Sequence, residues 1–151
     1  VPPRFMNEEL CHRNMAFTLY QADEMPRVKM GETKVERLGE NVYKVWVDLS
    51  NPKVTPTVLA KAAMNGIVPP DLLTVEGKAV EILSASWVTD KWRPAISQAI
   101  DQKDLKRIML RNGLTGKATK TIQYLVKGSG AMTVKYASVK GGTAEKTITL
   151  Q

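Results

Sequence analysis

The side chain best suited to chemistry in this sequence is His12, the single histidine among 151 residues. Glu8 precedes it by four residues, so a helix would place both side chains on one face, at a spacing that can bind a metal ion. Glu9 and Cys11 are the other candidate ligands nearby. One histidine without further ligands in view is more typical of a solvated helix face. We therefore predict no metal site and no catalytic residue in this chain.

Nucleophilic catalysis is not favoured either. A serine hydrolase triad would need His12 as its base, and the sequence places no serine and aspartate beside it. Cys11 is the one cysteine, so no internal disulfide can form. We expect Cys11 to be a small buried apolar residue on a helix rather than a nucleophile.

The three tryptophans are the candidates for ligand binding, because aromatic rings stack on sugars and on bases. Most tryptophans in a chain of this size belong to the core. Trp46 lies in a strongly alternating segment and is a plausible core anchor. Trp87 and Trp92 are the candidate binding residues. Either of them would be an exposed platform for a ligand or, in the alternative, a residue of the core.

The formal net charge of +7 raises the question of nucleic acid. The basic residues alternate along the expected strands instead of clustering, and the densest local group is Lys103, Lys106, Arg107 and Arg111. Lysines on strand edges and solvent faces commonly keep sheets from aggregating. We predict no nucleic-acid partner. No apolar run approaches 18 residues, so we also expect no membrane span.

The first 25 residues are predicted to form one helix, between the Pro2-Pro3 pair and Pro26. Two apolar stripes lie on opposite faces of this helix at 100° per residue. One stripe is Met6, Leu10, Phe17 and Tyr20, and the other is Cys11, Met15, Leu19 and Ala22. A surface helix usually has one stripe, so two stripes indicate burial on both sides. The simpler alternative is a second stripe that lies near the surface.

The chain begins at Val1 without an initiator methionine or a signal peptide, which favours a piece of a larger protein. The helix would then belong to a larger domain, and its interdomain face would be formed by Cys11, Met15, Leu19 and Ala22. In this chain that face is expected to be exposed and able to drive dimerisation.

From Arg27 onward the apolar residues recur with a period of two, which is typical of strands. The strongest segment spans residues 42–49, and its alternate members Tyr43, Val45, Val47 and Leu49 should face the core. Further strands are expected at residues 33–38, 72–76, 79–87, 105–110, 120–126, 132–138 and 146–150. Gly128-Ser129-Gly130 is a hairpin signal between two of them. Residues 57–64 fit a strand or a short helix, and residues 91–102 are predicted to be a loop with one helical turn at most.

Seven to nine short strands with regular turn signals indicate an antiparallel β-sandwich of the immunoglobulin or fibronectin kind, preceded by one helix. The cysteine–tryptophan–cysteine signature of antibody domains is absent. With 43% apolar residues the chain can bury a core. We predict a helical segment over residues 1–25 and a sandwich domain over residues 26–151.

The opening segment resembles a known family. Its sequence is Val-Pro-Pro-Arg-Phe-Met-Asn-Glu-Glu-Leu-Cys-His-Arg-Asn-Met-Ala-Phe-Thr-Leu-Tyr-Gln-Ala, residues 1–22. It resembles the closing helix of the catalytic domain in large bacterial zinc carboxypeptidases of the carboxypeptidase A-like family. An extra β-rich domain follows that helix, and residues 42–51, 65–73 and 139–149 resemble it more loosely. The resemblance favours a strand at residues 57–64.

The resemblance implies that this chain is the C-terminal fragment of such an enzyme, exported to the periplasm or the exterior. The family holds zinc with two histidines and a glutamate, and a second glutamate is the general base. None of these residues has a counterpart here, so zinc would belong to the parent enzyme and this chain would hold no cofactor. The expected function is a structural domain that packs on or positions the catalytic domain in cis. The alternative is a carbohydrate- or peptide-binding module that targets the parent enzyme.

Overall fold

The computed structural model describes residues 3–90 and 97–150. A single 3-10 turn, η1 (Arg4–Met6), leads into the long helix α1 (Asn7–Asp23), and a five-residue helix, α2 (Ala60–Met64), lies between strands. The described strands are β1 (Lys29–Gly39), β2 (Val42–Asn51), β3 (Asp71–Glu76), β4 (Val80–Val88), β5 (Ser97–Ala99), β6 (Arg107–Leu110), β7 (Ala118–Gly128), β8 (Gly130–Ser138) and β9 (Gly142–Leu150). None of the described helices is both long and apolar enough to cross a membrane.

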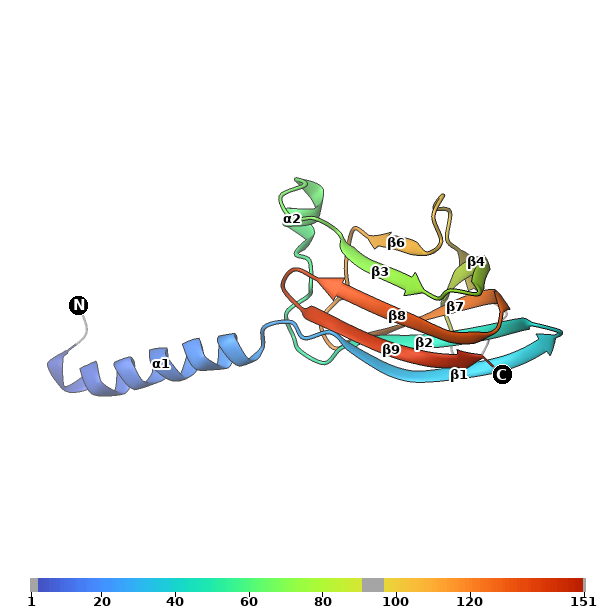
Figure 1. Cartoon of the computed structure of the whole chain (residues 1–151). Helices are drawn as coiled ribbons and strands as arrows, with labels where there is room; N and C mark the ends of the chain where they lie inside the picture. Colours follow the sequence, from blue (N-terminus) through green and yellow to red (C-terminus); the bar gives the residue numbers. More distant parts are fainter. Residues whose placement is uncertain (1–2, 91–96, 151) are drawn as a thin grey trace.

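The strands form two antiparallel sheets that pack face to face (Figure 1). One sheet has the order β1-β2-β7-β4-β5 and the other has the order β6-β3-β8-β9. The neighbours β1-β2-β7-β4 and β3-β8-β9 correspond to the ABED and CFG sheets of immunoglobulin domains. The predicted fold class, a mainly β sandwich with one N-terminal helix, is therefore confirmed.

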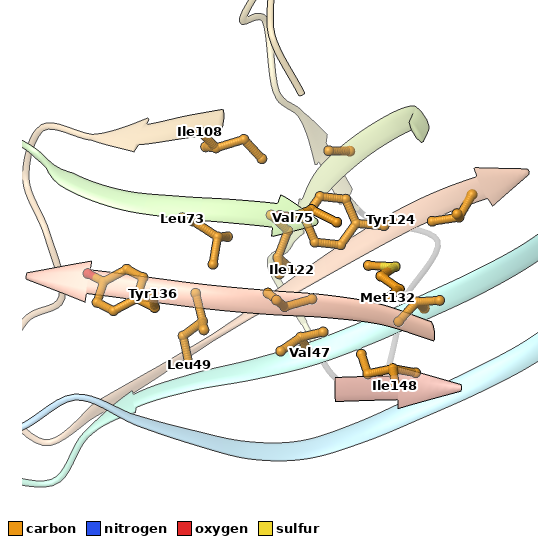
Figure 2. Packing of buried hydrophobic residues seen from close by; sticks show 14 of the residues in the cluster. Val47, Leu49, Leu73, Val75, Ile108, Ile122, Tyr124, Met132, Tyr136 and Ile148 are labelled. Atoms are coloured by element: carbon orange, nitrogen blue, oxygen red, sulfur yellow. The ribbon is translucent and has the colours of Figure 1, made fainter. Parts of the chain in front are cut away.

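The core lies between the sheets, and β2 shows how the sequence builds it. The alternate residues Tyr43, Val45, Val47 and Leu49 are all buried, as the pattern predicts. β7 lies beside β2 and adds Ile122, Tyr124 and Val126 to the same face. The opposite sheet adds Leu73, Met132, Val134, Tyr136 and Ile148 (Figure 2). Burial of each large aliphatic side chain stabilises the fold by roughly 1.5–3 kcal/mol, which makes this face the main source of stability.

The hairpin predicted at Gly128-Ser129-Gly130 joins β7 to β8. Gly128 and Gly130 have φ angles of 142° and 93°, which side chains other than glycine rarely allow. A Cβ on Gly128 would also lie 1.9 Å from the carbonyl oxygen of Ala79. The close approach of the β3–β4 connection therefore requires glycine at this turn.

Two local predictions were wrong or incomplete. The segment 57–64 holds helix α2 instead of a strand, because Ala60-Lys61-Ala62-Ala63-Met64 are strong helix formers and Gly66, at φ 62°, ends the helix. The segment 91–102, predicted as a loop, contains β5, which pairs with β4 through residues 97–99. Residues 91–96 lie outside the described residues. β6 begins at Arg107, two residues later than predicted.

Candidate functional site

The potential metal ligands of α1 lie in solvent. His12, Glu8 and Glu9 are exposed. Cys11 is exposed as well, so the expectation of a buried cysteine was wrong for this chain. Glu9 instead accepts an ion-pair hydrogen bond at 2.5 Å from Arg13, four residues later. Within the described residues, no group of three or more His, Cys, Asp or Glu side chains is close enough to hold a metal ion.

The apolar faces of α1 are the most unusual surface of the chain. The helix projects from one end of the sandwich as a rod (Figure 1), and none of its residues is buried. On one face Phe17 and Tyr20 are exposed by 60% and 59%, and on the other Met15 and Leu19 are exposed by 64% and 59%. Ala22 is exposed too. The predicted interdomain face of Cys11, Met15, Leu19 and Ala22 is therefore open to solvent.

Polar contacts fix the base of α1 to the sandwich. The ammonium of Lys53 donates to the carboxylate of Asp23 at 2.7 Å and lies 3.7 Å from that of Glu24. This charge and hydrogen bond hold the pKa of Asp23 below its usual value. Glu24 also accepts hydrogen bonds from the backbone N–H groups of Val54 and Thr55, at 2.9 and 3.3 Å. These contacts attach the helix to the sandwich at its C-terminal end.

A buried asparagine organises the connection between α1 and β1. Asn51, fully buried at the end of β2, accepts hydrogen bonds from the N–H groups of Arg27 and Lys53 at 3.2 and 3.3 Å. Its amide donates to the carbonyl groups of Thr55 and Thr115 at 2.8 and 3.4 Å. One side chain therefore satisfies four backbone groups of three segments, and it holds the linker against the sandwich.

An apolar groove of about 690 Å³ runs from the base of α1 onto the sandwich. Phe17, Tyr20 and Met25 line it on the helix side, and Val54 lines it on the loop after β2. The groove thus continues the exposed face of Phe17 and Tyr20 onto the body of the domain.

Trp46 is not the core anchor that the sequence suggested. It lies on the outer face of β2, because the alternate residues of that strand face the core. The ammonium groups of Lys34 and Lys44 lie 5.2 and 5.5 Å from its ring centroid, at distances that give cation–π attraction. The chain's own lysines therefore already occupy the surroundings of this ring.

Trp87, a predicted binding residue, lies on β4 beside Ile122 and packs partly against the core. Its remaining surface lines a polar hollow of about 270 Å³, shared with Gln102, Arg111 and Lys120. Trp92, the other predicted binding residue, falls outside the described residues, so the structure does not relate the two. The sequence did not predict the polar neighbours of Trp87, because they come from separate loops and strands.

The structure also contains a buried polar cluster that the sequence did not indicate. Asp71, 1% exposed at the start of β3, accepts hydrogen bonds on Oδ2 from the hydroxyl groups of Thr57 and Tyr136 at 2.5 and 2.7 Å. The Thr57 hydroxyl accepts a further bond from the N–H of Leu114 at 2.8 Å. Burial, with Asp71 alongside, raises the pKa of the Tyr136 phenol. The cluster is sealed from solvent and holds the loops after β2 and β6 against the sheet that contains β3 and β8.

The densest basic group of the sequence is exposed on the surface. Lys106, Arg107 and Arg111 are exposed and line three different hollows of the described surface. Lys103 is exposed on the loop before β6.

Residues 27–149 match the family described as Domain of unknown function (DUF8731). The match covers most of the chain, so the chain belongs to this family. The matched region begins after α1 has ended at Asp23. No curated protein and no solved structure matches the chain.

Proposed function

We propose that the sandwich of residues 26–151 is a non-catalytic accessory domain that packs on or positions a catalytic domain, to which α1 belongs. The observation that carries the proposal is α1 itself. It has apolar side chains on two opposite faces, and none of them is buried. A helix of this kind is normally found inside a domain, where both faces have partners. The family match begins at residue 27, after α1, and this supports a helix that belongs to another domain.

The resemblance of residues 1–22 supports a zinc carboxypeptidase of the carboxypeptidase A-like family as the catalytic partner. In this proposal zinc and the general base reside in that partner, and the compartment is the periplasm or the exterior. The partner would reach beyond the helix, because the apolar groove from Phe17 to Val54 continues the helix surface onto the sandwich. This shared surface would fix the orientation of the two domains.

A stability comparison tests whether α1 belongs to another domain. Leu19→Ala removes an exposed helix side chain and Leu73→Ala a fully buried sandwich side chain. We expect Leu19→Ala to change the free energy of unfolding by less than about 0.5 kcal/mol, and Leu73→Ala to lower it by about 2–5 kcal/mol. Urea denaturation of the full chain measures both. A loss above about 1.5 kcal/mol for Leu19→Ala would mean that the helix packs on its own sandwich, against the proposal.

Self-association provides the second test. Sedimentation velocity should show the chain dimerising with rising concentration through α1, since the helix faces lack their partner. Phe17→Glu and Leu19→Glu, on opposite faces, should weaken the dimer and reveal which face carries it. Val139→Glu is the matched control, because Val139 is equally exposed but lies on the sandwich. Dimerisation that persists in both helix variants would assign the contact to another surface.

Metal analysis and a carboxypeptidase assay on blocked dipeptides test the non-catalytic assignment. We expect no stoichiometric zinc and no hydrolysis by this chain. One zinc per chain together with activity would mean that His12 and surrounding carboxylates form a site, which would overturn the proposal.

The alternative function is a carbohydrate- or peptide-binding module that targets the parent enzyme. The hollow beside Trp87 favours it, because that hollow combines an aromatic wall with several polar side chains. The two functions are compatible, since α1 and the Trp87 hollow are formed by different parts of the chain.

A further inference from the structure

The hollow beside Trp87, called here the Trp87 hollow, is formed where β4, β6 and β7 meet. Trp87 comes from β4 and Lys120 from β7. Gln102 lies before β6, and Arg111 and Asn112 follow it. Residues far apart in the sequence therefore surround one cavity of about 270 Å³.

The walls of the Trp87 hollow are held in place without a ligand. The Gln102 amide donates to the carbonyl of Met109 at 3.0 Å, and its oxygen accepts from the N–H of the same residue at 2.9 Å. Gly113, at φ 54°, turns the chain between β6 and β7. Trp87 packs against the core. A preformed cavity loses little conformational entropy when a ligand binds.

Among the described residues, the side chains that line the hollow carry a positive charge without an acidic partner. Neither Arg111 nor Lys120 takes part in the three ion pairs found among the described residues. The ammonium of Lys120 makes only a long hydrogen bond, 3.4 Å, to the carbonyl oxygen of Gly113. Within the described chain no acidic side chain lines the cavity. Hydrogen-bond donors therefore outnumber acceptors, which suits an anionic ligand.

The size and the aromatic wall restrict the ligand further. A cavity of about 270 Å³ lies just below the range for small-molecule sites, about 300–1,000 Å³, and fits a single ring better than a larger ligand. The indole of Trp87 provides an apolar surface for the C–H face of a sugar, and the amide of Asn112 can bind hydroxyl groups. An extended peptide would instead need backbone pairing along a strand edge and apolar side-chain pockets.

We propose that the Trp87 hollow binds one carboxylated sugar, such as a uronic acid unit of an acidic polysaccharide. Arg111 and Lys120 bind the carboxylate, Trp87 contacts the ring, and Asn112 binds a hydroxyl group. This site would add attachment to an acidic glycan to the proposed accessory role, and it does not depend on the identity of the catalytic partner.

The test is a titration of the full chain with glucuronic acid, glucose and sodium acetate. The shifts of the amide and indole NMR signals report the binding of each compound. We expect glucuronic acid to bind at least about tenfold more tightly than either of the others, because only it offers both a ring and a carboxylate. The double variant Arg111→Gln/Lys120→Gln should weaken glucuronic acid binding by about tenfold or more. Lys140→Gln removes an exposed lysine from the β8–β9 turn and is the matched control, with an unchanged affinity.

Several results would overturn the proposal. Equal binding of glucose would mean that the two cations contribute nothing, and equal binding of acetate would reduce the hollow to a general anion site. Displacement of glucuronic acid by an acetylated tripeptide would favour a peptide ligand instead. Arg111 and Lys120 are exposed, so the double variant Arg111→Gln/Lys120→Gln should unfold at an unchanged temperature. That control separates a loss of binding from a loss of fold. An unchanged affinity for glucuronic acid in this variant would show that the Trp87 hollow is not the binding site.

Discussion

Two buried tyrosines provide the sharpest test of how the sandwich is stabilised. Tyr124 and Tyr136 are both fully buried in the core, and burial raises the pKa of each phenol. The hydroxyl of Tyr136 donates to Asp71 at 2.7 Å. The hydroxyl of Tyr124 is buried without a hydrogen-bond partner among the described residues. The same substitution, Tyr→Phe, should therefore have opposite effects at the two positions.

Tyr136→Phe removes one of the two hydroxyl donors of the buried Asp71 carboxyl and leaves only Thr57 on Oδ2. Oδ1 of Asp71 already lacks a partner in the described chain, so the side chain cannot compensate from its other oxygen. Hydrogen bonds to charged groups contribute about 1.5–3 kcal/mol. We expect the free energy of unfolding to fall by about 2 kcal/mol and the melting temperature by roughly 4–8 °C for a chain of this size.

Tyr124→Phe removes a buried hydroxyl that gains nothing from the protein, although it loses its water on folding. We expect this variant to be neutral or more stable by about 1 kcal/mol. Urea denaturation at pH 7, followed by far-ultraviolet circular dichroism, measures both variants. The slope of free energy against urea should stay constant, since the surface exposed on unfolding does not change.

The comparison has a clear contrary result. Equal destabilisation by the two variants would show that lost packing, rather than the bond to Asp71, determines the cost. Stabilisation by Tyr136→Phe would mean that the buried cluster reduces stability. The double variant Tyr136→Phe/Asp71→Asn separates these cases, because removal of the charge should make the missing hydroxyl less costly.

Three further predictions concern the same fold. The phenols of Tyr124 and Tyr136 ionise above pH 10 in the folded state but near pH 10 in the unfolded state. The free energy of unfolding should therefore fall as the pH rises through 10. This dependence of stability on pH should disappear in the double variant Tyr124→Phe/Tyr136→Phe. Gly113→Ala should lower the free energy of unfolding by several kcal/mol, because its Cβ would lie 2.2 Å from the Thr57 hydroxyl. Gly66 has a similar φ but open space around it, so Gly66→Ala should lower this free energy by only about 1 kcal/mol in the same urea assay. Asn51→Leu should lower the free energy of unfolding by about 3 kcal/mol or more, because it leaves four backbone groups unpaired. A loss under about 1 kcal/mol would mean that water replaces the amide as their hydrogen-bond partner.

The alternation of residues predicted the sandwich because the period of a half-buried strand is a local property of the chain. Tyr43, Val45, Val47 and Leu49 could be assigned to the core before any partner strand was known. The Gly128–Gly130 turn was predicted for the same reason, since its φ angles depend on the glycines themselves. At residues 57–64 local propensity allowed a strand or a short helix and the resemblance favoured a strand, but the helix formers of Ala60–Met64 form α2.

Trp46 shows how a residue type can mislead when its position in the pattern is overlooked. A tryptophan in a strong strand suggests the core, but its place among the alternate residues puts it on the outer face, where Lys34 and Lys44 contact it. Cys11 was expected to be buried as a small apolar residue, yet it lies exposed on α1.

The sequence by itself determined most of the strands, most of the core and the two-sided apolar character of α1, because each depends on residues close together along the chain. The tertiary structure alone decided which distant residues meet. Asp71 reaches Thr57 and Tyr136 only because β3 pairs with β8 and the loop after β2 folds over them. Trp87 lies beside Arg111 and Lys120 only because the end of β4, the end of β6 and the start of β7 line one hollow. No local pattern encodes such contacts, since they arise from the pairing of strands far apart in the chain.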